Sequence, residues 1–207
     1  MTIGHYMKGG IFMVSRQQQK SETTRSELMK AAVKTFKEMG FEEATISEIT
    51  CEAGYAKGNF YRYWSSKGDI FLDIMGQKLK QHRDKRDEKL AEAKDFDEAL
   101  EIVLDFLTTL LDDSRWADIF LEFTVHAAKT KDLREKLLQG VYRLSPEIFA
   151  DIFDPFTKNK RAKMEKLGAV VTALFEGFLI QHQLGYRKFN TKDLREVIIV
   201  LAEHYNN

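Results

Sequence analysis

Apolar residues recur at intervals of three and four along almost the whole chain, which is the spacing of one face of a helix. No stretch of useful length alternates apolar and polar residues as a half-buried strand does. Only two prolines occur in 207 residues, so few positions interrupt helices. The pattern therefore predicts an all-α protein with about nine helices in total.

The pattern is sharpest over residues 45–67, where it predicts two short helices joined by a tight turn. Thr45 and Glu48 have the spacing of a capping box, which marks the start of the first helix. Gly54 allows the positive φ that ends a helix at low cost. A second helix is expected to begin near Ala56, after this turn.

The second predicted helix has two chemically different faces. Phe60 and Trp64 lie four residues apart and form an apolar back. The remaining positions are cationic, amide-bearing, phenolic or without a side chain: Lys57, Gly58, Asn59, Tyr61, Arg62 and Tyr63. A short helix with this division suits insertion into the major groove of DNA.

Two further helices flank this motif. One is predicted to begin at Thr24, with Glu27 completing a capping box, and to end at Gly40. The other opens at residues 66–69 and runs to about residue 93, with an apolar first half and a second half of mixed charge. The first helix is expected to pack behind the motif, and the second to lead away from it.

The rest of the chain is predicted to form helices that begin near Asp95, Ser114, Lys131, Ala162 and Thr191. Pro146 is expected to break or kink the helix that begins at Lys131.

The motif resembles the DNA-binding signature of the TetR family of bacterial transcription regulators. The matching pieces are Thr45-Ile-x-x-Ile, the Ala53-Gly54 turn, Lys57-Gly-Asn-Phe-Tyr61 and the Ser66-Lys-Gly-Asp-Ile-Phe71 continuation. With Ala31-Ala32, Phe36 and Gly40-Phe41 upstream, the resemblance covers roughly residues 24–72. At the position of Trp64, family members usually carry phenylalanine or another aromatic residue. At the position of Tyr63 they often carry histidine.

This resemblance implies a helix-turn-helix DNA-binding domain over residues 21–68 and an effector-binding and dimerisation domain over residues 69–207. Residues 1–20 show no sustained period and are predicted to be a disordered extension. The alternative for this extension is a basic arm that reaches the minor groove through Lys8, Arg16 and Lys20.

The expected DNA contacts divide into base reading and backbone positioning. Lys57 and Asn59 can donate to guanine and pair with adenine, and Gly58 lets the backbone approach closely. The hydroxyls of Thr45, Tyr61 and Tyr63 suit phosphates. Tyr55 and Arg62 are expected to reach either target. Lys67, at the start of a helix, adds a full charge where a phosphate would lie.

Two groups of residues in the C-terminal domain carry further expectations. A homodimer interface is expected on the last two helices, formed by Ala169, Ala173, Gly177, Leu194, Ile198 and Leu201. An effector pocket, which the resemblance implies, is expected among Trp116, Phe120, Phe123, His126, Phe149, Phe178 and His182. For both groups the alternative is ordinary core packing within one chain.

Charge and composition narrow the function further. The net charge is zero, so affinity for DNA must come from a local patch. The single cysteine fits a reducing cytoplasm, and no apolar run is long enough for a membrane span. The sequence contains no Gly-x-Ser-x-Gly elbow, Walker loop or dinucleotide-binding glycine motif, and its histidines and cysteine do not have the spacing of metal ligands. No enzyme activity, metal or cofactor is therefore expected.

The sequence thus favours a homodimeric repressor that a small apolar or amphipathic ligand releases from a palindromic double-stranded operator. The alternative is a DNA-binding regulator without a small-molecule effector, which a partner protein controls or which acts as an activator. A small enzyme or a membrane-associated module fits poorly.

Overall fold

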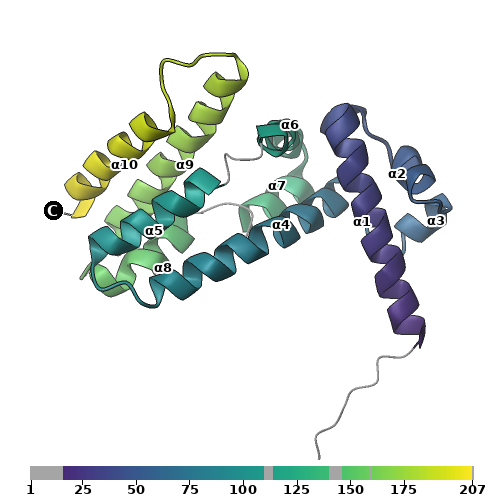
Figure 1. Cartoon of the computed structure of the whole chain (residues 1–207), viewed down its shortest axis with the longest axis horizontal. Coiled ribbons are helices and arrows are strands. Elements are labelled where there is room, and N and C mark those ends of the chain that lie inside the picture. The colour runs from purple at the N-terminus through teal and green to yellow at the C-terminus, as the bar shows by residue number, and fades with distance from the viewer. Residues whose placement is uncertain (1–15, 110–113, 140–145, 159, 207) are drawn as a thin grey trace, which may run out of the picture.

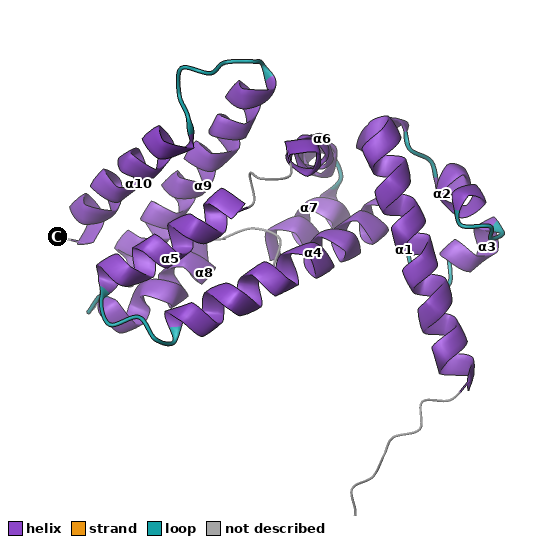
Figure 2. Cartoon of the chain, in the orientation of Figure 1, coloured by secondary structure: helices purple, strands orange, loops and turns teal. Residues whose placement is uncertain are grey.

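The computed structural model describes residues 16–109, 114–139, 146–158 and 160–206. Within these ranges the chain forms helices and no strand (Figure 2), which confirms the predicted all-α class. They contain ten α-helices and one short 3-10 helix, close to the nine helices predicted. Residues 1–15 of the predicted disordered extension lie outside the described part of the chain.

The helices form a small group at one end of the molecule and a larger group at the other (Figure 1). Helices α1–α3 form the small group, α5 and α8–α10 form the larger one, and α4 runs between them. The bounds are α1 Arg16–Glu43, α2 Ile46–Glu52, α3 Lys57–Phe60, α4 Lys67–Leu90, α5 Phe96–Thr109, α6 Ser114–Lys129, α7 Lys131–Gln139, α8 Pro146–Phe153, η1 Asp154–Phe156, α9 Arg161–Gln183 and α10 Thr191–Asn206.

The first helix begins earlier than predicted. Helix α1 starts at Arg16, so residues 16–20 are helical and do not belong to a disordered extension. The expected cap at Thr24 is not a helix start, because its side chain is buried and the helix continues through it. Glutamine, lysine and glutamate in residues 17–22 favour helix and extend it upstream without a capping residue.

The ends of the helices in the motif agree with the prediction. The hydroxyl of Thr45 accepts from the Glu48 N–H, and the Glu48 carboxylate accepts from the Thr45 N–H, which is a complete capping box. Gly54 follows α2 with a φ of 71°. The Ser66 hydroxyl accepts from the Asp69 N–H and caps α4. Local sequence therefore sets the path of the chain through this region.

The apolar core consists of two clusters. The first, called the head cluster, joins α1–α3 and the first half of α4 to α6 and α7. The second, called the body cluster, joins α5 to α8–α10. Helices α6 and α7 therefore share a core with α1–α3, so the two clusters divide the chain at a different place from the predicted boundary between residues 68 and 69.

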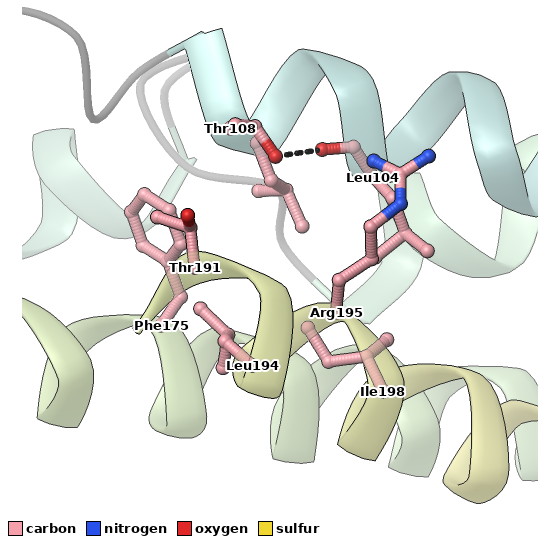
Figure 3. A pocket seen from close by; sticks show the side chains of 8 residues that line it. Leu104, Thr108, Phe175, Thr191, Leu194, Arg195 and Ile198 are labelled. Atoms are coloured by element: carbon pink, nitrogen blue, oxygen red, sulfur yellow. Dashed lines mark hydrogen bonds between the residues drawn. The ribbon is translucent and has the colours of Figure 1, made fainter. Parts of the chain in front are cut away.

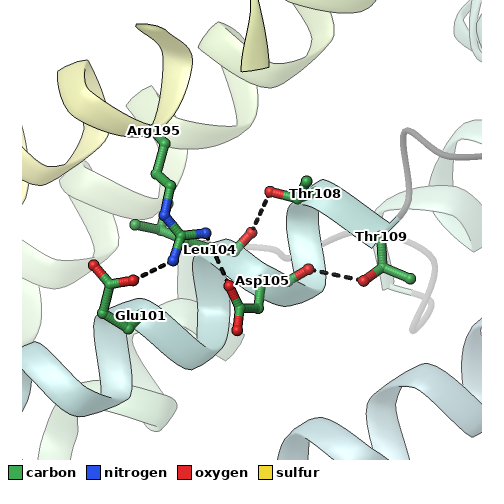
Figure 4. A network of polar contacts seen from close by, with 6 residues as sticks. All are labelled: Glu101, Leu104, Asp105, Thr108, Thr109 and Arg195. Atoms are coloured by element: carbon green, nitrogen blue, oxygen red, sulfur yellow. Dashed lines mark hydrogen bonds and ion pairs between the residues drawn. The ribbon is translucent and has the colours of Figure 1, made fainter. Parts of the chain in front are cut away.

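An ion-pair network ties two helices of the body together at its surface (Figure 4). Arg195 on α10 donates to Glu101 and, at 2.9 Å, to Asp105, both on α5. More than half of each of the two acidic side chains is exposed to solvent, so we expect this network to contribute at most about 1 kcal/mol.

Candidate nucleic-acid interface

The back of α3 is anchored in the head cluster. Phe60 is fully buried and Trp64 is nearly so, with their rings 5.4 Å apart. The Trp64 Nε1–H donates to Asp73 Oδ2 at 2.9 Å, and the Arg25 guanidinium pairs with the same carboxylate. The predicted apolar face is confirmed, and its contacts fix the direction in which the opposite face points.

The front of α3 is open to solvent. Lys57, Gly58, Tyr61 and Arg62 are exposed, and the side chain of Tyr61 is 53% exposed. The Asn59 side chain is half-buried, and its Nδ2 donates to the Ala56 carbonyl at 3.4 Å. The structure thus brings a cation, a phenol and a bare backbone position together on one short helix and the turn that follows it.

Two of the predicted DNA-contacting tyrosines also hold the motif to α1. The Tyr63 hydroxyl donates to the Ser21 carbonyl at 3.0 Å. The Tyr55 hydroxyl donates to the Glu27 carboxylate. Each phenol hydroxyl therefore joins the motif to α1. Phosphate contact by either residue stays a prediction.

Lys67 lies differently from the prediction. Its Nζ donates to the carbonyls of Phe41 at 2.6 Å and Glu42 at 2.8 Å, and it sits 4.5 Å from the centre of the Phe41 ring. Partial burial lowers the pKa of its ammonium, although nearby carboxylates, Glu42 first among them, act in the opposite direction. Here Lys67 closes the end of α1 because the last carbonyls of that helix need donors.

Thr45 occupies an exposed position at the start of α2. Its hydroxyl donates to Glu48 Oε2 at 2.8 Å and accepts from the Glu48 N–H at 3.2 Å. Its role as a helix cap is therefore plain in the structure, and its predicted phosphate contact stays a prediction.

The comparisons with known proteins agree with this geometry. The family model for bacterial regulatory proteins of the tetR family matches residues 28–74, which run from the middle of α1 into the first third of α4. Over these residues the chain has the DNA-binding domain of the TetR family. The known proteins that match the chain include HTH-type transcriptional regulators, in line with the prediction that it is not an enzyme.

Relatives along the chain extend the comparison. The chain is 31% identical over 128 residues to YfiR of Bacillus subtilis, an uncharacterised HTH-type transcriptional regulator, and the match spans 61% of this chain and 62% of that protein. It therefore covers less than two thirds of this relative's length.

Solved structures share the fold at low identity. FadR of Thermus thermophilus, a TetR-family repressor in complex with lauroyl-CoA, aligns with a TM-score of 0.67 and 20% identity over 86% of this chain and 93% of that one. A putative regulator of Saccharomonospora viridis in complex with choline aligns with a TM-score of 0.64 and 19% identity over 88% of this chain and 97% of that one. These likenesses establish the fold.

The residues expected to form an effector pocket do not lie together. Trp116, Phe120 and Phe123 pack in or against the head cluster, whereas Phe149 and Phe178 belong to the body cluster. His126 contacts Glu42 of α1 and His182 is exposed at the end of α9. This prediction is wrong as a single site, because helical spacing identifies apolar residues but does not tell which neighbour covers them.

A cavity with other walls lies between α7, α8 and α9. It measures about 420 Å³, and its walls are formed by Leu138, Pro146, Glu147, Ala169, Thr172, Ala173 and Glu176. A second crevice between α5, α9 and α10 measures about 10 Å³ (Figure 3), which is room for one water at most. Sequence reasoning missed most of the large cavity because the chain segments that form it are far apart in sequence.

The predicted dimer residues divide into two sets. Leu194 and Ile198 are buried in the body cluster, so they cannot form a surface; this part of the prediction is wrong because α5 covers them. Ala169 and Ala173 are exposed, and Gly177 and Leu201 are partly so. Large apolar side chains are also exposed on or beside the same two helices: Ile180, Leu184, Val197 and Val200.

No described helix is both long enough and apolar enough to cross a bilayer. Among the described residues, histidine, cysteine and carboxylate side chains form no group that could hold a metal ion.

Proposed function

We propose that this protein is a homodimeric transcriptional repressor that inserts α3 into the major groove of a palindromic operator. The observation that carries the proposal is the division of α3 and the turn after it into a buried, hydrogen-bonded back and a front that exposes Lys57, Gly58 and Tyr61. In this assignment Lys57 reads base edges, Gly58 permits close approach, and Tyr61 and Arg62 hold phosphates.

Dimerisation is proposed through the exposed face of α9 and α10. Gly177, Ile180 and Leu184 recur at helical spacing along α9 and its C-terminal end, and Val200 on α10 is 64% exposed. A two-fold partner would cover these side chains, and small residues let its helices approach closely. Two α3 helices related by the two-fold would then read half-sites about one helical turn apart.

The effector is proposed to bind in the cavity between α7, α8 and α9, within the domain assigned to residues 69–207. Its volume of about 420 Å³ lies in the range of small-molecule sites. The walls combine apolar side chains with the hydroxyl of Thr172 and the carboxylates of Glu147 and Glu176. This lining suits a small amphipathic ligand, and the proposed site of action is the cytoplasm, where operator DNA and effector meet.

The alternative is a regulator with no small-molecule effector. Binding of test ligands distinguishes this alternative from the proposed function. The solved neighbours with lauroyl-CoA and choline supply two probes of opposite charge. We expect choline or a longer quaternary ammonium to raise the melting temperature more than lauroyl-CoA, because the cavity carries carboxylates. In a thermal-shift assay, Glu176→Gln should reduce the response. No shift with either probe, or with a wider amphipath panel, would favour control by a partner protein.

Replacing Gly58 by alanine tests the DNA-facing role of α3. A Cβ at this position meets no heavy atom within 4 Å, so nothing inside the protein requires glycine there. Alanine should stabilise the fold by about 0.5–1 kcal/mol, because glycine is a poor helix former. The added methyl should weaken operator binding because it faces the groove. Thermal melts and anisotropy titrations of the same variant check both signs, and unchanged affinity would place the DNA elsewhere.

A further inference from the structure

Helix α1 is interrupted at Gly40, which has φ 84° and ψ 174°. In a continuous α-helix the N–H of Phe41 would donate to the carbonyl of Lys37. At this bend the Phe41 N–H donates to Glu122 Oε2 at 2.7 Å. The Lys37 carbonyl accepts from Arg115 Nε at 3.0 Å. The Phe41 N–H and the Lys37 carbonyl, which the bend separates, therefore each form a hydrogen bond with a side chain of α6.

The fit between α6 and this bend is close. Arg115 and Glu122 are seven residues apart, so they lie on the same face of α6, two turns from each other. A Cβ on Gly40 would stand 2.8 Å from Glu122 Oε2, so any side chain there displaces the carboxylate. His126, one turn further along α6, lies with its Nδ1 3.1 Å from Glu42 Oε1. One face of α6 thus contacts α1 before, at and after its bend.

Helix α6 is placed between the two ends of the molecule. Its buried Ile119 and Phe123 belong to the head cluster. On another side α6 contacts α9, which belongs to the body cluster. A movement of α6 relative to α9 would therefore displace the backbone of α1 through Arg115 and Glu122. Because α2 and α3 pack against α1, they would move with it.

We propose that Arg115 and Glu122 are positioning residues that clip the bend of α1 to α6 and so set the angle between the DNA-binding motif and the body. In a dimer this angle determines the separation of the two α3 helices. The inference rests on the proposed function, because that separation matters only to a dimer that binds two half-sites at once.

The test compares two duplexes: a full operator with both half-sites and a duplex with a single half-site. Glu122→Ala should bind the full operator about tenfold more weakly and the half-site within about twofold of wild type, because each head remains intact. Glu122→Gln should stay close to wild type, since its amide oxygen can still accept from the Phe41 N–H. Arg115→Ala should repeat the pattern of Glu122→Ala, and circular dichroism checks that each variant is folded.

An equal loss on both duplexes would show local damage to the head, and no loss on either would show that the clip is dispensable; both results overturn the inference. If Glu122→Ala does not fold, the ratio of full-site to half-site binding in Arg115→Ala decides. Failure of the wild-type protein to bind the full operator is a separate result and would overturn the proposed function itself.

Discussion

Replacing Phe71 by alanine is expected to lower the free energy of unfolding by about 3–5 kcal/mol, the usual range for a buried phenylalanine. Phe71 is fully buried where α1, α4 and α6 meet. Its ring stacks 4.4 Å from Phe123 and packs edge-on against Phe36 and Phe41 at 5.6 and 5.3 Å. Alanine would leave a cavity among rings that cannot all collapse into it.

Chemical denaturation followed by tryptophan fluorescence measures this loss, because both tryptophans of the chain, Trp64 and Trp116, lie in the head cluster. Tyr61→Ala is the matched control: it also removes an aromatic ring, but one that is 53% exposed, and it should change stability by less than about 1 kcal/mol. A loss below about 1 kcal/mol in Phe71→Ala would contradict the packing of α6 against the head.

Replacing Lys57 by alanine is expected to weaken operator binding by about 1–3 kcal/mol for each half-site and to relax preference at one base position. Lys57 is exposed at the start of α3, where a side chain can reach base edges. Stability should hardly change, because no packing is lost. Competition titrations against operators with single-base changes measure both the affinity and the lost preference.

Lys85→Ala is the control for charge. Lys85 is exposed on the second half of α4, and its removal changes the net charge by the same amount. It should leave operator binding within about twofold of wild type, because the second half of α4 runs away from α1–α3 (Figure 1). An equal loss in both variants would mean that Lys57 acts only through overall charge and does not read bases.

Local signals in the sequence were sufficient to predict the motif. The capping box at Thr45 and the turn at Gly54 depend on neighbours within a few residues, and the structure shows both where they were expected. The apolar pair Phe60 and Trp64 was likewise predicted from a four-residue spacing and is buried. Short-range chemistry of this kind needs no knowledge of the rest of the fold.

Contacts between distant segments could not be predicted in the same way. Lys67 carries a positive charge at a helix start, but its partners are two carbonyls about 25 residues upstream, which the end of α1 leaves without helical partners. Leu194 and Ile198 are apolar on one face of α10, but only the fold shows that α5 covers them. Glu122 shows no local motif, and its role follows from a backbone N–H 81 residues away.

The central claim is that residues 45–67 bind a palindromic operator as part of a dimer. The most direct measurement is selection of bound duplexes from a randomised pool, followed by sequencing and anisotropy titration of the enriched DNA. The account predicts a pseudo-palindrome, two protomers per duplex, and affinity that falls as salt rises. No enrichment at low salt, from protein refolded to remove any carried-over effector, would contradict it and leave the motif with a purely structural role.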